Sequence, residues 1–425
     1  MKTDKRIQSI PSTLPVPYLL IMLICLVSSC HSKQTGEGDG KIPGAANLDS
    51  LHFQAVAAPE WTALVTRNSG WFGGDGIFAV TRDGKESPGS SHNSEALIWF
   101  SDTMLGDIIG DSLRPGYVMI HNSVAVLQPW GKDGSSNNGA PDSAQIKYYW
   151  KMENGKPASL FDPHTPASQK GDYYWMGDGF VNQEKQNDLY IFGYQIKNIS
   201  DTVAFGFKEV GNTLVIVPSG SQPPFSNYRQ IDIPFYAGRD VDSTGSFGAG
   251  IFVNTVEAGV SNPDGYVYIY GVRGKLKSLM VARVKPADIE VFDKWTFWDG
   301  HGWNSDPNKI VTVTDRLSNE LGVMQLMDGR YALVFQADGL GRYVGLRLGA
   351  TPYGPFGRLI NVYDVSKDLT ESKNFFPYNA KVHPVLSSPD ELVISYNINS
   401  FDFFKEIKKW PHLYRPRFIK VKILP

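Results

Sequence analysis

Asp264-Gly-Tyr-Val-Tyr-Ile-Tyr-Gly271 is an apolar β run introduced by a turn, and it decides the fold because the chain repeats this pattern five times. The other copies are Ala96-Leu-Ile-Trp-Phe-Ser-Asp-Thr103, Asp188-Leu-Tyr-Ile-Phe-Gly-Tyr194, Asp328-Gly-Arg-Tyr-Ala-Leu-Val-Phe335 and Asp390-Glu-Leu-Val-Ile-Ser-Tyr396. About ten residues before each copy, a second strand-like run begins in a patch rich in Gly, Asp or Asn. A hairpin that recurs every several tens of residues is typical of a propeller with one sheet per repeat. We therefore expect an all-β fold, a five-bladed β-propeller of antiparallel blades that begin near Asp75, Asp178, Ala249, Glu320 and Asn379.

A six-bladed sialidase-like propeller is the alternative fold. The chain has no repeated Ser-x-Asp-x-Gly-x-x-Trp box and no arginine triad at matching positions, which argues against it. All-β architectures of 425 residues commonly form one domain, and the aromatic content of 12% with 42 Gly and 27 Pro favours strands and turns. A formal net charge of −2 with scattered basic residues makes a nucleic-acid or anionic-membrane surface unexpected.

The N-terminal 30 residues have the pattern of a bacterial lipoprotein signal. Basic residues come first, an apolar stretch follows from Val16 to Val27, and Leu26-Val-Ser-Ser-Cys30 ends it with small residues before a cysteine. We expect Cys30 to be lipidated and to anchor the protein at the outer membrane of a Gram-negative bacterium, facing either the periplasm or the exterior. An ordinary secretory signal with an incidental cysteine is the alternative. Residues 31–50 are polar and Gly-rich and predict a flexible tether, followed by one domain over 51–425 that we expect to be monomeric.

The expected domain contains no cysteine, because Cys25 and Cys30 both lie in the signal. A disulfide, a zinc–cysteine cluster and a cysteine nucleophile are therefore excluded there. The sequence also lacks a P-loop, a dinucleotide fingerprint, a nucleophile elbow and an HExxH helix, so we expect no cofactor. Calcium at the propeller axis would suit such a fold, but no Asp-x-Asp-x-Asp loop is present.

Three aspartates are candidates for chemistry. Asp75 and Asp178 each lie between glycines where an innermost strand begins, and Asp102 ends the second strand of the first blade. Glycoside hydrolysis needs one carboxylic acid and one carboxylate, and crowding of like charges separates their pKa values. The alternative is that these aspartates only accept hydrogen bonds from backbone amides at the starts of blades.

Further residues are candidates for substrate binding around the same central opening. Trp71 and Trp175 could offer faces to a sugar, although packing in the core is an alternative for each. The remaining candidates are Asn122, Glu320, Asn379 and His383, and a buried, hydrogen-bonded position is the alternative for His383. No metal ligands are proposed.

The segments Gly73-Gly-Asp-Gly76 and Trp99-Phe-Ser-Asp-Thr103 resemble the five-bladed propeller lipoproteins grouped as domains of unknown function 4185 and 5005. Thr351-Pro-Tyr-Gly-Pro-Phe356, Tyr378-Asn-Ala-Lys-Val-His-Pro384 and Ile394-Ser-Tyr-Asn397 match the same group, so the resemblance spans about Trp61 to Ser400. Ser101 stands where these relatives usually have glycine. Some relatives are endo-D-arabinanases, and the resemblance implies that their paired aspartates fall on Asp75 and Asp102.

The expected function is a glycoside hydrolase that acts on a polysaccharide, such as an arabinan or another furanose-containing glycan. A non-catalytic glycan-binding envelope lipoprotein of an uptake system and a structural, partner-binding propeller are the alternatives. For the hydrolase we expect Asp75 as base or nucleophile, kept ionised by backbone amides and water, and Asp102 as general acid near Trp99 and Phe100. Asp178 would tune or orient them, and the order of the first two could be reversed.

Overall fold

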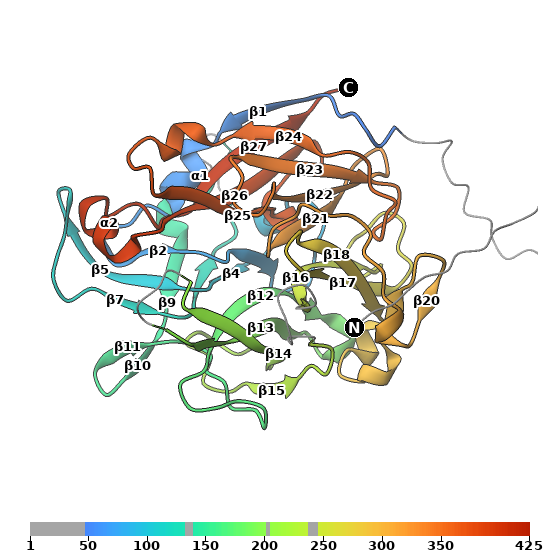
Figure 1. The fold of residues 1–425 in the computed structure, drawn as a ribbon, viewed down its shortest axis with the longest axis horizontal. Helices are drawn as coiled ribbons and strands as arrows, with labels where there is room; N and C mark the ends of the chain where they lie inside the picture. The colour runs from blue at the N-terminus through green and yellow to red at the C-terminus, as the bar shows by residue number, and fades with distance from the viewer. Residues whose placement is uncertain (1–46, 132–138, 201–204, 237–244) are drawn as a thin grey trace, which may run out of the picture. The chain divides into compact units, whose positions relative to one another are not determined.

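The computed structural model describes residues 47–131, 139–200, 205–236 and 245–425, which belong to one compact unit over 46–425 (Figure 1). The expected signal, Cys30 and most of the expected tether lie outside the described residues. The last tether residues, 47–50, are not free: the Arg330 guanidinium donates to Asn47 O at 2.7 Å and to Ser50 O at 3.0 Å. Among the described residues, no helix combines the length and apolar character needed to cross a membrane.

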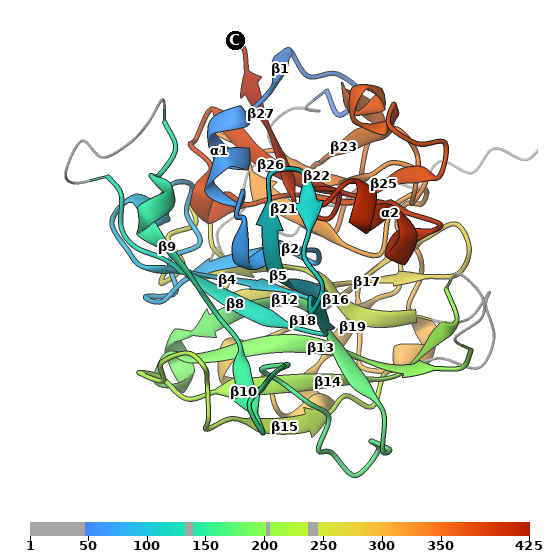
Figure 2. The same ribbon diagram turned by 90° about the vertical axis from the view of Figure 1, so that its left-hand side faces the viewer.

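Four antiparallel sheets have strands that follow one another in chain order, and a fifth adds the first strand of the described chain at its outer edge; the all-β expectation is confirmed. The first sheet contains β3 (Phe78–Thr81), β4 (Ala96–Phe100), β8 (Ser123–Leu127) and β9 (Ile146–Tyr149). The second contains β12 (Tyr173–Asn182), β13 (Asp188–Asn198), β14 (Phe207–Val217) and β15 (Arg229–Asp232). Figure 2 shows β13, β14 and β15 side by side in this order.

The third and fourth sheets continue the pattern. The third contains β16 (Gly245–Asn254), β17 (Tyr266–Arg273), β18 (Ser278–Val284), β19 (Thr296–Trp298) and β20 (Trp303–Asn304). The fourth contains β21 (Leu321–Gln325), β22 (Tyr331–Gln336), β23 (Tyr343–Gly349) and β24 (Ile360–Asp364). Asp264-Gly265 and Asp328-Gly329 form turns before β17 and β22, and the φ values of +77° and +85° at these glycines explain the residue choice.

The fifth sheet joins the two ends of the described chain. It contains β25 (Phe375–Val382), β26 (Glu391–Ser400) and β27 (Arg417–Ile423), and β1 (Phe53–Ala57) pairs with β27 as its outer strand. The register runs from Phe53 opposite Ile423 to Ala57 opposite Ile419, and Figure 1 shows β1 beside β27 near the C-terminus. This pairing ties the start of the described chain to its end.

Smaller elements surround the first and fifth sheets. An accessory sheet contains β2 (Ser69–Gly74), β5 (Thr103–Ile109), β6 (Ser112–Leu113) and β7 (Val118–Ile120). The pair β10 (Lys151–Glu153) and β11 (Lys156–Ala158) forms a separate hairpin, and the helices are α1 (Pro59–Leu64) and α2 (Phe403–Lys409).

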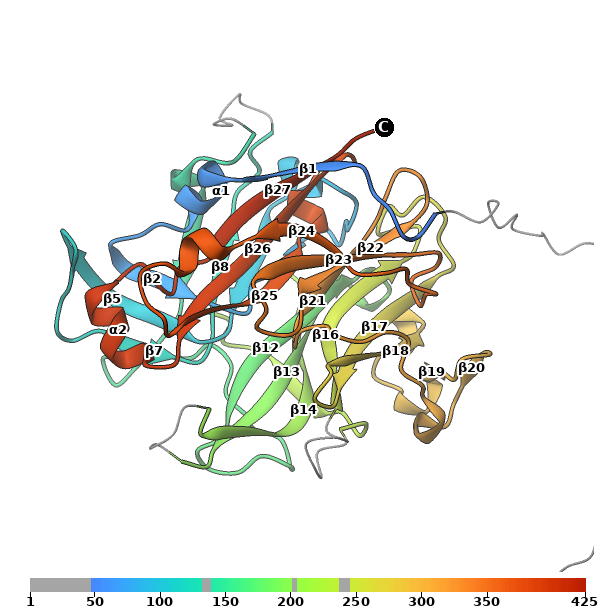
Figure 3. The same ribbon diagram turned by 45° about the horizontal axis from the view of Figure 1, so that its top comes forward.

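The first strands of successive sheets contact one another: β3 with β12, β12 with β16, β16 with β21, and β21 with β25. Figure 3 shows β12, β16, β21 and β25 gathered at the middle of the view, with later strands of these sheets farther out. A cavity of about 30 Å³ is lined by residues from all five first strands, among them Phe78, Gly179, Val253, Val323 and Val382. Segments about 300 residues apart in sequence therefore meet at one place.

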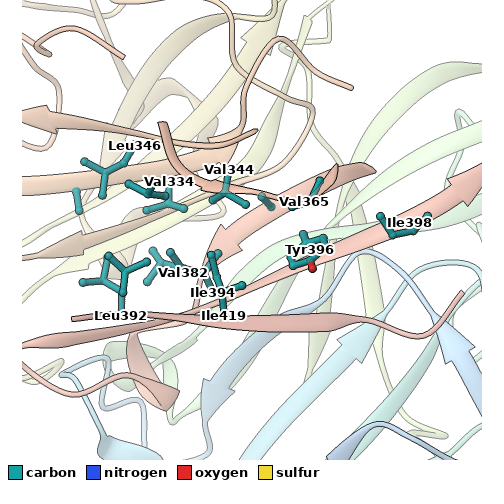
Figure 4. Close-up of a cluster of buried hydrophobic side chains, with 14 of the residues drawn as sticks. Val334, Val344, Leu346, Val365, Val382, Leu392, Ile394, Tyr396, Ile398 and Ile419 are labelled. Atoms are coloured by element: carbon teal, nitrogen blue, oxygen red, sulfur yellow. The ribbon is translucent and has the colours of Figure 1, made fainter. Parts of the chain in front are cut away.

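The core lies between neighbouring sheets. Figure 4 shows apolar side chains of the fourth and fifth sheets facing one another, including Val334, Leu346, Val382 and Ile394. Because a sheet with neighbours on both faces must be apolar on both, β22 is buried at every position instead of alternating between buried and exposed. This accounts for the continuous apolar runs in the repeats.

We expect Ile394→Ala to lower the free energy of unfolding by about 2–5 kcal/mol, because the fully buried side chain would leave a cavity between two sheets. The matched control is Ile109→Ala in β5, where the side chain is 58% exposed and the expected change is within about 0.5 kcal/mol. Urea unfolding of both variants measures this difference. Equal losses in the two variants would contradict the assigned core.

Candidate active site

Asp75 lies where β2 ends and β3 begins, opposite Asp102 on the neighbouring chain segment. The Asp75 amide donates to the Asp102 carbonyl oxygen at 3.2 Å, and the Ser101 amide donates to the Asp75 carbonyl oxygen at 2.8 Å. Gly76 follows with φ of +59°, and a Cβ there would come within 2.5 Å of Ser101 Oγ, so a larger residue would disrupt this pairing. Ser101 Oγ also accepts from the Met176 amide at 2.8 Å, which fastens the first sheet to the second.

The Asp75 carboxyl group is held by two tyrosine hydroxyls. Tyr378 and Tyr414 each donate to its Oδ2 at 2.7 Å, and its Oδ1 is buried without a hydrogen bond to any described residue. Burial, together with the negative charges of Asp102 and Glu320, raises the pKa of Asp75 to about 8. This corrects the expected environment of backbone amides and water: at neutral pH the surroundings favour the protonated acid.

Asp102 is held by a histidine. Its Oδ1 lies 2.9 Å from His121 Nδ1, within hydrogen-bond distance. The imidazole stacks on Tyr173 with ring centroids 3.7 Å apart. The Asp102 side chain is 15% exposed and keeps access to solvent, whereas the Oδ1 atom of Asp75 is buried.

Asp178 lies at a β-bulge in β12, and its carboxyl group accepts hydrogen bonds from two backbone amides. Gly179 N donates to Oδ1 at 2.8 Å, and Ile251 N of the third sheet donates to Oδ2 at 2.7 Å. Burial raises the pKa of Asp178 to about 7 against the lowering effect of these amides. Asp178 therefore joins two first strands, which is the structural role weighed for it, while its carboxyl group remains near the others.

Glu320 and Asn379 form part of one network with Lys381. Asn379 Nδ2 donates to Glu320 Oε1 at 2.9 Å, and the fully buried Lys381 ammonium donates to Glu320 Oε2. Burial raises the pKa of Glu320, and Lys381 opposes this shift. Glu320 in turn raises the pKa values of Asp75 and Asp178, so the carboxyl groups are close enough to interact.

The other four predicted binding residues lie outside this group: Trp71, Asn122, His383 and Trp175. Trp71 is 1% exposed and stacks on Tyr148 at 4.4 Å, which leaves no free face for a sugar. Asn122 is fully buried and bonds to the backbone of Phe161 and Tyr174, so its amide is engaged within the core.

His383 is 2% exposed, and its Nε2 lies 2.7 Å from Ser395 Oγ. Burial lowers the pKa of His383 to about 3, so the ring is neutral. His383 lines the cavity of about 30 Å³ together with Asp178 and the half-buried Glu86. A neutral, hydrogen-bonded histidine is the structural alternative weighed above.

Trp175 is partly exposed. Its ring contacts that of Tyr173, which stacks on His121. His121, Tyr378, Tyr414 and Lys381 were not singled out by the sequence analysis. His121 directly precedes the candidate Asn122, and Tyr378 and Lys381 lie on either side of the candidate Asn379. Their positions next to predicted binding residues could have marked these three. Tyr414 lies between α2 and β27, outside the repeats, and no sequence signal marks it. Among the described residues, no group of three or more His, Cys, Asp or Glu side chains could hold a metal ion.

We expect Asp75→Asn to change how stability depends on pH. The folded-state pKa of about 8 lies above the ordinary value of 3.8, so the folded protein binds the extra proton between these values. Stability contributed by this proton is present at low pH and is lost as pH rises toward 8, by at most about 1.4 kcal/mol per pH unit. Denaturant unfolding between pH 5 and pH 8 should show a shallower decline for Asp75→Asn than for the natural protein.

The exposed Asp315 supplies the control for this measurement. Asp315→Asn should keep the natural slope over the same pH range. If Asp75→Asn also kept it, the raised pKa of Asp75 would be excluded.

Comparison with known proteins bears on the fold and the family. A crystal structure described as "a putative hydrolase from Bacteroides ovatus" is similar with a TM-score of 0.63 at 20% identity, covering 89% of this chain and 93% of that one. A GH43_1 enzyme from Xanthomonas citri complexed with xylose aligns with a TM-score of 0.41 at 14% identity, covering 87% of this chain and 91% of that one. An exo-beta-1,3-galactanase from Phanerochaete chrysosporium aligns with a TM-score of 0.40 at 10% identity, covering 87% and 66%.

The first similarity supports a shared fold, and the other two are too low to carry an argument. No curated protein matches the sequence. The family described as "Domain of unknown function (DUF5005)" matches residues 59–423. The chain therefore belongs to this family.

Proposed function

We propose that the protein is a glycoside hydrolase and that Asp75 and Asp102 carry its reaction. One observation carries this proposal: two facing aspartates occupy different environments. Asp75 has one buried carboxyl oxygen and a pKa raised to about 8, while the Asp102 side chain is 15% exposed and lies beside His121. Hydrolysis of a glycosidic bond requires an acid and a carboxylate placed close together in this way.

In the proposed reaction Asp75 is the general acid, and this reverses the order first expected from the sequence. The Asp75 proton passes to the glycosidic oxygen as its bond to the anomeric carbon breaks. The Asp102 carboxylate either takes a proton from a water molecule that attacks the anomeric carbon, or attacks that carbon itself to form an ester that water then hydrolyses. The products are two sugar fragments, one of which carries a new reducing end.

Glu320 and Asp178 support the acid. The charge of Glu320 raises the pKa of Asp75, and Lys381 keeps that carboxylate in place. The Asp178 carboxyl group accepts a hydrogen bond from the Ile251 amide of the third sheet and interacts electrostatically with Glu320. Asp178 and Glu320 are therefore positioning and tuning residues in this scheme.

We infer that the five sheets are the blades of a five-bladed β-propeller. Three features support this: each sheet is a meander, the first strands contact one another in sequence, and all five first strands line one axial cavity. The pairing of β1 with β27 would close the ring by uniting the two chain ends in one blade.

We propose an arabinan or another furanose-containing polysaccharide as substrate, on the resemblance to endo-D-arabinanases. The placement proposed for the enzyme is the cell envelope, as a monomer anchored through a lipid on Cys30. Both proposals rest on the sequence motifs given above.

We expect Asp75→Asn and Asp102→Asn each to lower turnover by about 10²–10⁴-fold, since each removes an ionisable group that acts in the transition state. Glycan affinity should survive, because asparagine preserves size. Release of new reducing ends from a panel of plant and bacterial glycans measures turnover. Asp328→Asn, in a turn before β22, is the control and should leave turnover unchanged.

Near-normal turnover of both variants would show that another pair of groups acts. Binding of a glycan by the natural protein without cleavage would favour the glycan-binding lipoprotein instead. Neither binding nor cleavage would favour a structural, partner-binding role.

We expect Cys30→Ala to move the protein from the membrane fraction to the soluble fraction, because the lipid is the proposed anchor. Fractionation of cells that express each form, followed by immunoblotting, measures this. Membrane attachment that persists in the variant would contradict lipidation at Cys30.

A further inference from the structure

A series of aromatic rings leads away from Asp102 along the second sheet. His121, which holds Asp102, stacks on Tyr173 at 3.7 Å. Tyr173 contacts Trp175 at 6.1 Å between ring centroids, and Trp175 contacts Phe207 edge-on at 4.5 Å. These contacts extend from the carboxylate to the start of β14.

Phe205 carries this series across to the fifth sheet. Its ring lies 6.0 Å from that of Phe207, 6.0 Å from Phe376 in β25 and 5.9 Å from Phe401. Its φ of +60° is uncommon for a bulky residue, and such backbone conformations occur preferentially where function requires them. The second and fifth sheets are thus connected by aromatic contacts although their strands are not paired.

The series returns to the other carboxyl group. Phe376 contacts Phe401 at 4.6 Å and Tyr378 at 5.8 Å, and the Tyr378 hydroxyl donates to Asp75. The Asp75 amide donates a hydrogen bond to the Asp102 carbonyl oxygen, so the series of contacts returns to the residue where it began. We call its eight rings the aromatic collar; they belong to His121, Tyr173, Trp175, Phe207, Phe205, Phe401, Phe376 and Tyr378.

The collar has two exposed rings and two buried polar atoms that make no hydrogen bond to any described residue. Phe205 and Phe401 are 53% and 51% exposed, although large aromatic side chains are usually covered. Trp175 Nε1 and Asp75 Oδ1 are buried and make no hydrogen bond to any described residue. A ligand with an apolar face could cover the two exposed rings, whereas the two buried atoms lie out of its reach.

We propose that the aromatic collar is a sugar-binding subsite and that Phe205 and Phe401 stack on the apolar face of a neutral glycan. This inference rests on the proposed function, because it places the glycan beside the same two aspartates. Phe205 and Phe401 are then specificity-determining residues.

The charges around the collar select a neutral glycan. Asp102 and Glu320 lie at its inner end beside the protonated Asp75, and Lys381 is already engaged by Glu320. No collar residue is Lys or Arg. A glycan with uronate or sulfate groups would therefore find no cationic side chain among the collar residues to pair with its charge.

Binding can be tested in the Asp75→Asn background, which prevents turnover. The probes are neutral arabino-, xylo- and galacto-oligosaccharides and, for comparison, anionic oligogalacturonides, measured by titration calorimetry and tryptophan fluorescence. Phe205→Ala and Phe401→Ala should each weaken binding of the preferred neutral probe about five- to tenfold. Phe205→Tyr and Phe401→Tyr, which retain the rings, should preserve it.

Phe404→Ala is the matched control, because Phe404 is 57% exposed in α2 and contacts Phe403 rather than the collar. Unchanged affinity in Phe205→Ala and Phe401→Ala, tighter binding of oligogalacturonides, or no binding of any neutral probe would overturn the proposal. A dimer that these two alanine variants dissociate would also overturn it, by assigning the rings to a second copy of the chain.

These results separate the subsite from the hydrolase. Collar-dependent binding without cleavage by the natural protein would support the subsite and contradict the hydrolase. Cleavage whose KM is unaffected in the collar variants would support the hydrolase and contradict the subsite.

Discussion

The ion pair between Lys381 and Glu320 is the interaction on which the arrangement of the site depends. Lys381 is fully buried in β25, and Glu320 lies just before β21, so the pair fastens the fifth sheet to the fourth. A buried ammonium group is costly unless it is paired, and buried carboxyl groups are costly unless a cation or a proton neutralises them. The Lys381 ammonium group therefore lowers the free-energy cost of placing several carboxyl groups where the first strands meet.

The distribution of protons follows from this arrangement. Lys381 favours the ionised form of Glu320, and the resulting negative charge disfavours a second carboxylate at Asp75. The tyrosine hydroxyls on Asp75 favour its ionised form but do not offset burial. The same crowding that would destabilise the folded protein at high pH supplies a proton donor near neutral pH, which connects the stability of the site to its proposed chemistry.

The sequence predicted the parts of the structure that repeat. The five apolar runs became second strands, and the Gly- and Asp-rich patches before them became first strands, because local periodicity and turn residues determine both. The convergence of Asp75, Asp102, Asp178, Glu320 and Asn379 followed from that repetition. Burial could not be predicted: Trp71 and Asn122 are engaged by residues distant in sequence, and only tertiary packing decides this. Tyr414 was missed for the same reason, since it reaches Asp75 from 339 residues away.

The central claim is that Asp75 is the protonated acid at neutral pH. Direct titration of its side-chain carboxyl carbon tests this, using ¹³C NMR of aspartate-labelled protein with the signal assigned by its absence in Asp75→Asn. Tyr414→Phe removes one hydroxyl that stabilises the carboxylate and should move the midpoint upward. The account predicts a midpoint of about 8 in the natural protein and a higher one in Tyr414→Phe. A midpoint near the ordinary value of 3.8 would contradict it.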